Sequence, residues 1–283
     1  MGSGMTEPEF AFFDFGPLAV LSPRHGDERD LAEGYYLLER DERTAMRDAL
    51  ARHTEEVTFW YGLLSNHRRT LEGMSSPHPG DIAFVARRQI LSLGLASSKA
   101  ALDALLAGYY SVGYSSIRHM SECWFLSRYL ECHPEMNAGL YARQPGSKNV
   151  KIPEAYELIK AVEKCNHPLA PTATARFMRK IWINMSKGAH VTGEGIVQTA
   201  SNEDGVAHLG ATYVPEMAVA GFAYGIQVGY YLVREALWRM RGESDEAAEV
   251  ARDLRRALDS VITNMEKTYG KSDIDDSEQE EEN

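Results

Sequence analysis

The stretch PEMAVAGFAYGIQVGYYLVREALWRMRG, residues 215–242, decides the fold. Pro215 is suited to begin a helix and Gly242 to end it. Apolar side chains lie on nearly every side of this helix. Its uncharged apolar run, residues 217–233, is shorter than the roughly 20 residues that a membrane span needs. We therefore expect this segment to be a buried helix at the centre of a helical protein.

Three glycines mark one face of this segment. Gly221, Gly225 and Gly229 are spaced four residues apart, so they line up as a smooth groove on a helix. A glycine inside a helix costs about 1 kcal/mol relative to alanine, so a row of three needs a gain from packing. The groove predicts close approach of another helix, with a flat ligand as the alternative, and the three glycines are ligand-binding candidates.

Helical periodicity extends along most of the chain. Apolar spacing predicts helices at 28–72, 81–107, 109–131, 153–166, 172–190, 215–242 and 245–269. Gly34 and Thr54 are the places where the first of these could divide, and the apolar residues of 81–107 nearly surround the helix, so we expect it to be central. Two short apolar runs flank the turn sequence Ser-Asn-Glu-Asp-Gly at 201–205, which predicts one small β-hairpin near 195–213.

The predicted fold is all-α, a bundle of about six or seven helices with this hairpin. Residues 24–270 form a single helical domain in this prediction. Residues 1–23 comprise an added leader before Met5 and a hydrophobic arm that carries Phe10, Phe12 and Phe13. Residues 271–283 form an acidic tail that we expect to be disordered, because a run of like charge buries nothing.

Charge and cysteine content bound the partners and the compartment. The formal net charge is −11, which argues against nucleic acid and against an anionic membrane surface. Cys123, Cys132 and Cys165 are an odd number in a long chain, which favours free thiols in a reducing, cytoplasmic location. No Cys-x-x-Cys, no repeated Glu-x-x-His and no nucleotide-binding loop is present, so we expect no metal and no cofactor.

Two predicted helices carry polar residues inside apolar periodicity. Arg118 and Glu122 are four residues apart on one helix, and Ser186 and His190 are four apart at the end of another. A charged pair in such a setting forms either a buried ion pair that fixes the helix register or a ligand site. These four residues are therefore ligand-binding candidates.

A resemblance rests on these residues. Arg-x-x-x-Glu on a central helix (Arg118, Glu122), a helix that ends in Ser-x-x-x-His (Ser186, His190), a hairpin and two closing helices resemble a group of bacterial all-helical proteins, over roughly residues 85–240. Some of that group are associated with phage defence. The group in turn resembles HEPN domains, which are helical bundles that often dimerise and sometimes cleave RNA.

The HEPN ribonuclease signature is an arginine, four to six residues, and a histidine. Arg47–His53 and Arg128–His133 both have this spacing. The resemblance implies a metal-independent ribonuclease with His53 as general acid and base and Arg47 as the stabiliser of phosphate charge. Residues six apart point to different faces of a straight helix, however, so we expect Arg47 and His53 not to converge.

Two functions follow from the sequence. The first is a helical interaction or ligand-binding protein, expected to be a homodimer, that binds a small molecule or a protein and has a link to phage defence. The alternative is the HEPN-like ribonuclease. Net negative charge and the lack of a basic patch interleaved with aromatic residues favour the first.

The acidic tail gives a first testable prediction. Deleting residues 272–283 removes seven acids and no base, with Ile274 as the sole aliphatic residue. Because such a segment has little to bury, the melting temperature should stay nearly unchanged in differential scanning calorimetry. A loss of more than a few degrees would show that the tail docks on the helical body.

Overall fold

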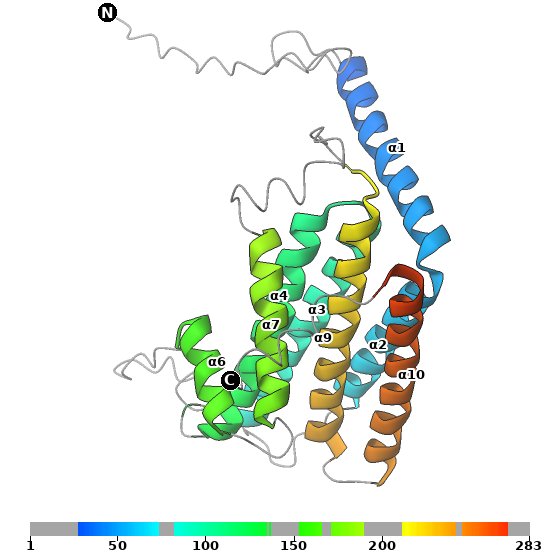
Figure 1. Cartoon of the computed structure of the whole chain (residues 1–283). Helices are drawn as coiled ribbons and strands as arrows, with labels where there is room; N and C mark the ends of the chain where they lie inside the picture. The colour runs from blue at the N-terminus through cyan, green and yellow to red at the C-terminus, as the bar shows by residue number, and fades with distance from the viewer. Residues whose placement is uncertain are drawn as a thin grey trace, which may run out of the picture.

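The computed structural model of the chain describes residues 28–73, 82–134, 136, 153–165, 171–189, 211–241 and 245–270. Eight helices are seen in this part of the chain, and apart from the helical Met136 its remaining residues are in neither helix nor strand (Figure 1). The helices are α1 (Glu28–Arg52), α2 (Thr54–Glu72), α3 (Ile82–Leu106), α4 (Tyr110–Cys132), α6 (Ala155–Cys165), α7 (Thr172–Ala189), α9 (Pro215–Arg241) and α10 (Asp245–Tyr269). The all-α prediction is confirmed for these residues, and none of their helices is long and apolar enough to cross a membrane.

Helix α9 lies at the centre, as its apolar sequence predicts. It packs against α2, α3, α4 and α10, and Phe222, Ile226 and Leu232 have no exposed surface (Figure 1). Helix α3 contacts α1, α2, α4 and α9, in keeping with the expectation that residues 81–107 form a central helix. Its apolar residues do not surround it completely in the core, because Val85 and Leu93 are exposed.

The glycine row lets α9 approach its neighbours. A Cβ at Gly225 would overlap the ring of Trp60 from α2, and one at Gly221 would lie 2.6 Å from Leu105 of α3. The Trp60 indole N–H donates a 2.8 Å hydrogen bond to Ser98 Oγ of α3. One tryptophan thus joins α2, α3 and α9, and the row is filled by side chains of the protein itself.

The turn between α3 and α4 also requires a glycine. Gly108 has φ +79°, a conformation that L residues rarely adopt, and a Cβ there would lie 2.6 Å from the backbone of Thr212. The Tyr110 hydroxyl accepts a hydrogen bond from Val214 N–H, and the Tyr114 hydroxyl donates to Met217 O. These contacts hold the start of α9 against the start of α4.

Helix α10 packs on α9 through the apolar side of an amphipathic helix. Leu258, Val261 and Met265 are buried, while its opposite face is exposed. A buried ion pair between Arg128 and Glu235 holds the C-terminal part of α4 against the C-terminal part of α9. Ser127 Oγ also donates a hydrogen bond to Glu235, at 2.8 Å. The hydrogen-bonded pair satisfies charges that would be costly to bury alone.

Residues 28–72 form two helices that divide at His53, so the predicted break at Thr54 is found and the one at Gly34 is not. The expectation for the cysteines needs correction. Cys132 and Cys165 are not free thiols but form a disulfide that joins the ends of α4 and α6. Cys123 is buried, and burial raises the pKa of its thiol to about 12. Because Cys132 and Cys165 are bonded to each other, they no longer support the prediction of a cytoplasmic location, which stays a prediction.

Three other expectations lie wholly or mostly outside the described residues. These are the N-terminal arm, the acidic tail and the hairpin near 195–213, of which residues 211–213 alone are described and are not in a strand.

Two glycine substitutions test the packing of α9. Gly225→Ala should destabilise the protein by about 1–3 kcal/mol, because the added methyl group forces the Trp60 ring away from α9. Gly62→Ala is the matched control on α2, where a Cβ would meet nothing within 4 Å. It should stabilise by up to about 1 kcal/mol through helix propensity alone. Urea unfolding of both variants measures the difference, and a Gly225→Ala variant as stable as wild type would contradict the account.

Candidate functional site

Arg118 and Glu122 come together with a residue that sequence reasoning did not include. Arg118 Nε donates to Glu122 Oε1 at 3.0 Å, and the Trp182 indole N–H of α7 donates to the same oxygen at 3.0 Å. The Arg118 guanidinium lies 5.1 Å from the centre of the Trp182 ring. About 27% of the Arg118 side chain and 30% of the Glu122 side chain are exposed. The cluster is therefore a partly exposed α4–α7 contact, neither sealed in the core nor set in a deep cavity.

The second half of the expected network is only partly brought to this cluster. Ser186 follows Trp182 by one turn, but its hydroxyl donates to Trp182 O at 2.7 Å, within its own helix. His190 lies outside the described residues. The described part of the network fixes α7 on α4 through Glu122.

Arg47 and His53 do not converge. The Arg47 side chain is 75% exposed, and its Nε lies 3.3 Å from Asp48 Oδ1. His53 has no exposed surface. The second match to the ribonuclease signature also separates, because Arg128 is buried against Glu235 while the ring of His133 stacks on Tyr129 at the end of α4.

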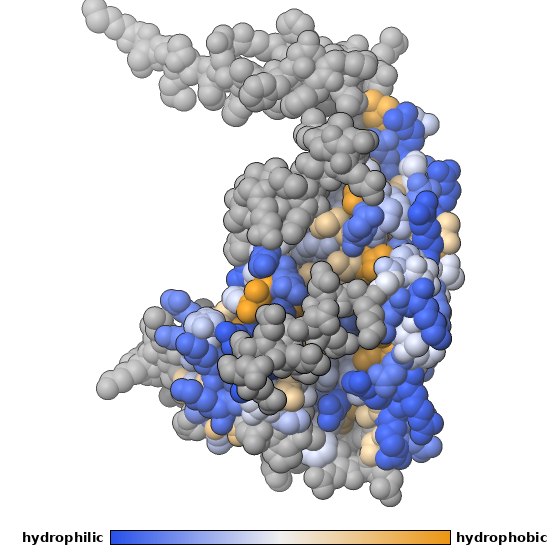
Figure 2. All heavy atoms as spheres, in the orientation of Figure 1, coloured by the Kyte–Doolittle hydropathy of each residue, from blue (hydrophilic) through white to orange (hydrophobic). Residues whose placement is uncertain are grey.

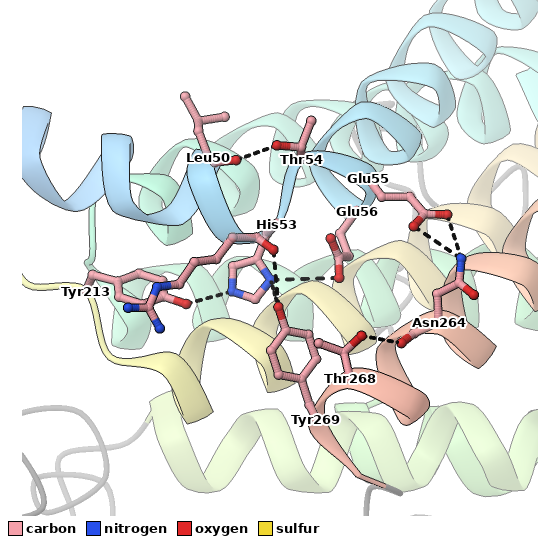
Figure 3. A network of polar contacts seen from close by, with 10 residues as sticks. Leu50, His53, Thr54, Glu55, Glu56, Tyr213, Asn264, Thr268 and Tyr269 are labelled. Atoms are coloured by element: carbon pink, nitrogen blue, oxygen red, sulfur yellow. Dashed lines mark hydrogen bonds and ion pairs between the residues drawn. The ribbon is translucent and has the colours of Figure 1, made fainter.

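His53 is the centre of a buried polar network (Figure 3). Its Nε2 lies 2.9 Å from the Tyr213 hydroxyl, and its Nδ1 lies 3.3 Å from the Tyr269 hydroxyl and 3.8 Å from Glu56 Oε1. The ring of Phe222 packs on the imidazole at a centroid distance of 4.9 Å. The network joins the break between α1 and α2 to the start of α9 and the end of α10.

The tyrosines in this network are poor acids. Burial raises the pKa of Tyr213 to about 12, and burial together with Glu56 raises the pKa of Tyr269. Both hydroxyls therefore stay protonated at neutral pH and serve as hydrogen-bond partners for the imidazole. His53 has no exposed surface, so the arrangement of these residues is suited to holding elements together.

The other candidate sites are closed or lack ligands. Gly221, Gly225 and Gly229 face Leu105, Trp60 and Leu63, so they leave no groove for a flat ligand. Within the described ranges, no group of three or more histidine, cysteine, aspartate or glutamate residues could hold a metal ion. His67 is a buried histidine of α2, and desolvation lowers its pKa to about 4, so it stays neutral in the core.

The outer face of α1 was not among the sequence candidates. Helix α1 packs on α2 and α3 through Ala45 and Ala49, while Tyr36, Met46 and Leu50 on its other side are 63%, 39% and 39% exposed. In Figure 1 this helix extends past the upper end of the bundle, and in Figure 2 hydrophilic residues dominate the same edge. Apolar side chains among charges on an outward-facing helix are typical of an interaction surface.

This outer face also contains a hollow. It has a volume of about 260 Å³ and is lined by long side chains from consecutive turns of α1: Tyr36, Glu39, Arg40, Arg43, Thr44 and Arg47. Glu39 and Arg43 form an ion pair across it, with Arg43 Nη2 2.9 Å from Glu39 Oε2. We call the surface formed by Tyr36, Glu39, Arg43, Met46 and Leu50 the α1 outer face.

The two residues of the ribonuclease signature should behave very differently when substituted. His53→Ala should destabilise the protein by about 2–5 kcal/mol, because it leaves a cavity and removes the partner of two tyrosine hydroxyls. Arg47→Ala should change stability by less than about 0.5 kcal/mol, since the side chain is exposed. Thermal unfolding of both variants measures this, and a His53→Ala protein as stable as Arg47→Ala would contradict the structural role of His53.

Comparison of the chain with protein-family models, with curated proteins and with solved structures found no match. The resemblance to HEPN-type helical proteins therefore stays a prediction from the sequence.

Proposed function

We propose that the protein is a non-enzymatic helical interaction protein that acts as a homodimer, with the α1 outer face as its working surface. One observation carries this proposal: Tyr36, Met46 and Leu50 are exposed along one side of α1, which is packed on the body through Ala45 and Ala49, while Leu38 on the side of these alanines is exposed as well. Exposing these side chains to water costs free energy that a protein partner would recover.

The interior of the bundle supports the same conclusion. Its potential ligand sites are occupied by the protein's own side chains, with Trp60 against Gly225 and the tyrosines around His53. The Arg118–Glu122 pair is engaged by Trp182 of the same chain. A surface interaction therefore fits the structure better than a buried small-molecule site.

The ribonuclease alternative has less support. General acid–base catalysis needs a histidine within hydrogen-bond reach of its substrate. His53 has no exposed surface and is bonded to Tyr213 and Tyr269, while Arg47 points to solvent from another side of α1. The link to phage defence that the resemblance implies is compatible with an interaction protein and is not needed for the proposal.

Analytical ultracentrifugation of the full chain over a range of concentrations tests the proposal. The wild-type protein should show a concentration-dependent monomer–dimer equilibrium. Met46→Glu combined with Leu50→Glu should shift it to monomer with little change in melting temperature, because two charges enter the contact and none enters the core.

Leu93→Glu is the matched control for this experiment. Leu93 is 54% exposed on α3, away from α1, so its substitution adds a charge to an apolar surface position without touching the α1 outer face. The control variant should dimerise like wild type. A wild-type protein that stays monomeric at the highest concentration, or a dimer that the α1 variant leaves intact, would contradict the proposal.

An RNA-cleavage assay in the presence of EDTA tests the alternative separately. Purified wild-type protein should leave single-stranded RNA intact. Metal-independent cleavage that disappears in the folded Arg47→Ala variant would favour the ribonuclease, and this variant is informative because its fold should be preserved.

A further inference from the structure

The geometry points to a specific partner and orientation for the α1 outer face: the α1 helix of a second copy of this chain, packed antiparallel about a twofold axis that passes beside residue 41. This inference rests on the proposed function, since it names the contact through which the homodimer forms. Three features of the α1 outer face support it, namely the spacing of its residues, the hollow between them and the order of their charges.

The spacing of the α1 outer face is that of a two-helix seam. Tyr36, Glu39, Arg43, Met46 and Leu50 follow one another at intervals of three, four, three and four residues. This alternation keeps side chains on one stripe of a helix and is the repeat by which two helices pack along their length. Ala45 and Ala49, which face α2 and α3, lie outside this stripe.

The hollow has the form that such packing requires. In helix pairs of this kind, a side chain of one helix enters a hole between four side chains of the other. Tyr36, Glu39, Arg40 and Arg43 surround such a hole within the volume of about 260 Å³. In the register described below, the side chain of the facing helix that lies at the level of this hole is that of Arg43, beside Glu39.

The charges select the antiparallel orientation. Glu39 precedes Arg43 by one turn, and the two form an ion pair within α1. A second α1 laid parallel in register would place Glu39 beside Glu39 and Arg43 beside Arg43. Laid antiparallel, it places each glutamate beside the arginine of the other chain, so four charges alternate around the axis and attract one another.

One register satisfies both the charges and the apolar residues. If Glu39 faces Arg43 of the second copy, the residue numbers of facing positions add up to 82. Tyr36 then faces Met46 of the second copy on both sides of the axis. Apolar residues meet apolar residues and opposite charges meet in the same register, which is the self-complementarity that a twofold contact requires.

A second copy explains this pattern better than a foreign partner. An unrelated protein would need an apolar patch and charges of its own, but it would place no constraint on how Tyr36 relates to Met46 or Glu39 to Arg43 within one helix. The self-matching order of the stripe is therefore the reason to name this chain as its own partner.

Charge reversal tests the orientation. Glu39→Arg alone places an arginine opposite Arg43 of the second copy. Arg43→Glu alone places a glutamate opposite Glu39 of the second copy. Each should raise the Kd of the dimer by about tenfold or more at low salt, with a smaller effect at high salt. The double variant Glu39→Arg/Arg43→Glu should restore the Kd to within a few-fold of wild type, and mixing the two single variants should give a heterodimer.

Arg68→Glu is the matched control. Arg68 and Glu72 form an exposed ion pair one turn apart on α2, with Arg68 Nε 2.7 Å from Glu72 Oε1. Reversing this charge disrupts the same kind of pair away from α1, so the Kd of the dimer should not change.

Crosslinking with a short bismaleimide tests the register. Tyr36→Cys chains mixed with Met46→Cys chains should give a crosslinked dimer, while Tyr36→Cys alone should give none. The two copies of residue 36 would lie ten residues apart along the axis, or about 15 Å. Crosslinking of Tyr36→Cys to itself would show a parallel pair and overturn the inference.

The outcomes separate this inference from the proposed function. A wild-type protein that never dimerises contradicts both. A second outcome separates them. If Met46→Glu/Leu50→Glu abolishes the dimer, but the charge reversals leave its Kd unchanged and no crosslink forms between positions 36 and 46, the α1 outer face remains the interface and the antiparallel register is overturned.

Discussion

The contact between Trp60 and Gly225 is the constraint on which the rest of the structure depends. The indole ring occupies the space where any residue other than glycine at position 225 would carry its Cβ, and the indole N–H donates a hydrogen bond to Ser98. Through this one side chain, α2, α3 and α9 share a single core. The helix break at His53 precedes this contact, and from there α1 extends along the outside of the bundle (Figure 1).

The same packing determines where function can reside. A bundle that fills its glycine row with tryptophan and leucine, and closes its histidine in with two tyrosines, has used its interior for stability. Buried charges are likewise paired within the core, as Arg128 is with Glu235. What remains available is the surface, and on α1 three of the four exposed apolar side chains that the structure describes, Tyr36, Met46 and Leu50, follow a packing repeat.

Sequence reasoning succeeded where the signal is local. Apolar periodicity located the helices within a few residues, and the near-continuous apolar sequence of 217–233 identified the buried helix, because burial on all sides leaves no room for charge. The glycine spacing predicted a close helix contact, although nothing in the sequence could name Trp60 as the residue that fills it. The stripe on α10 was equally clear, since its polar face is exposed.

Sequence reasoning failed where the cause is distant in the chain. Thr54 indicates where the helix could divide, but the hydrogen-bond partners of His53 at that break, Tyr213 and Tyr269, lie 160 and 216 residues away in sequence, so no local pattern reveals them. An odd number of cysteines does not exclude a disulfide, because Cys132 and Cys165 are bonded while the third, Cys123, is a buried free thiol. The spacing of Arg118 and Glu122 indicates their pairing, but nothing in the sequence points to Trp182 of α7 as the partner of Glu122.

The α1 outer face was missed for a different reason. Its three-and-four spacing is present in the sequence, but two of its five positions are charged, so an apolar pattern alone does not show it. Only the structure separates the residues that face the body, such as Ala45 and Ala49, from those that face outward. Once Glu39 and Arg43 are known to face outward, their order along α1 favours an antiparallel second copy, in which each glutamate lies beside the arginine of the other chain.

The central claim is that two copies of α1 pack antiparallel, and distances between spin labels test it most directly. Labels at position 40 lie two residues apart along the proposed axis, and labels at position 51 lie twenty apart, or about 3 and about 30 Å. The account therefore predicts a much longer distance between labels at 51 than between labels at 40. Equal short distances at both positions would show a parallel pair, and the absence of any dipolar signal at dimer-forming concentrations would show that α1 does not pair at all.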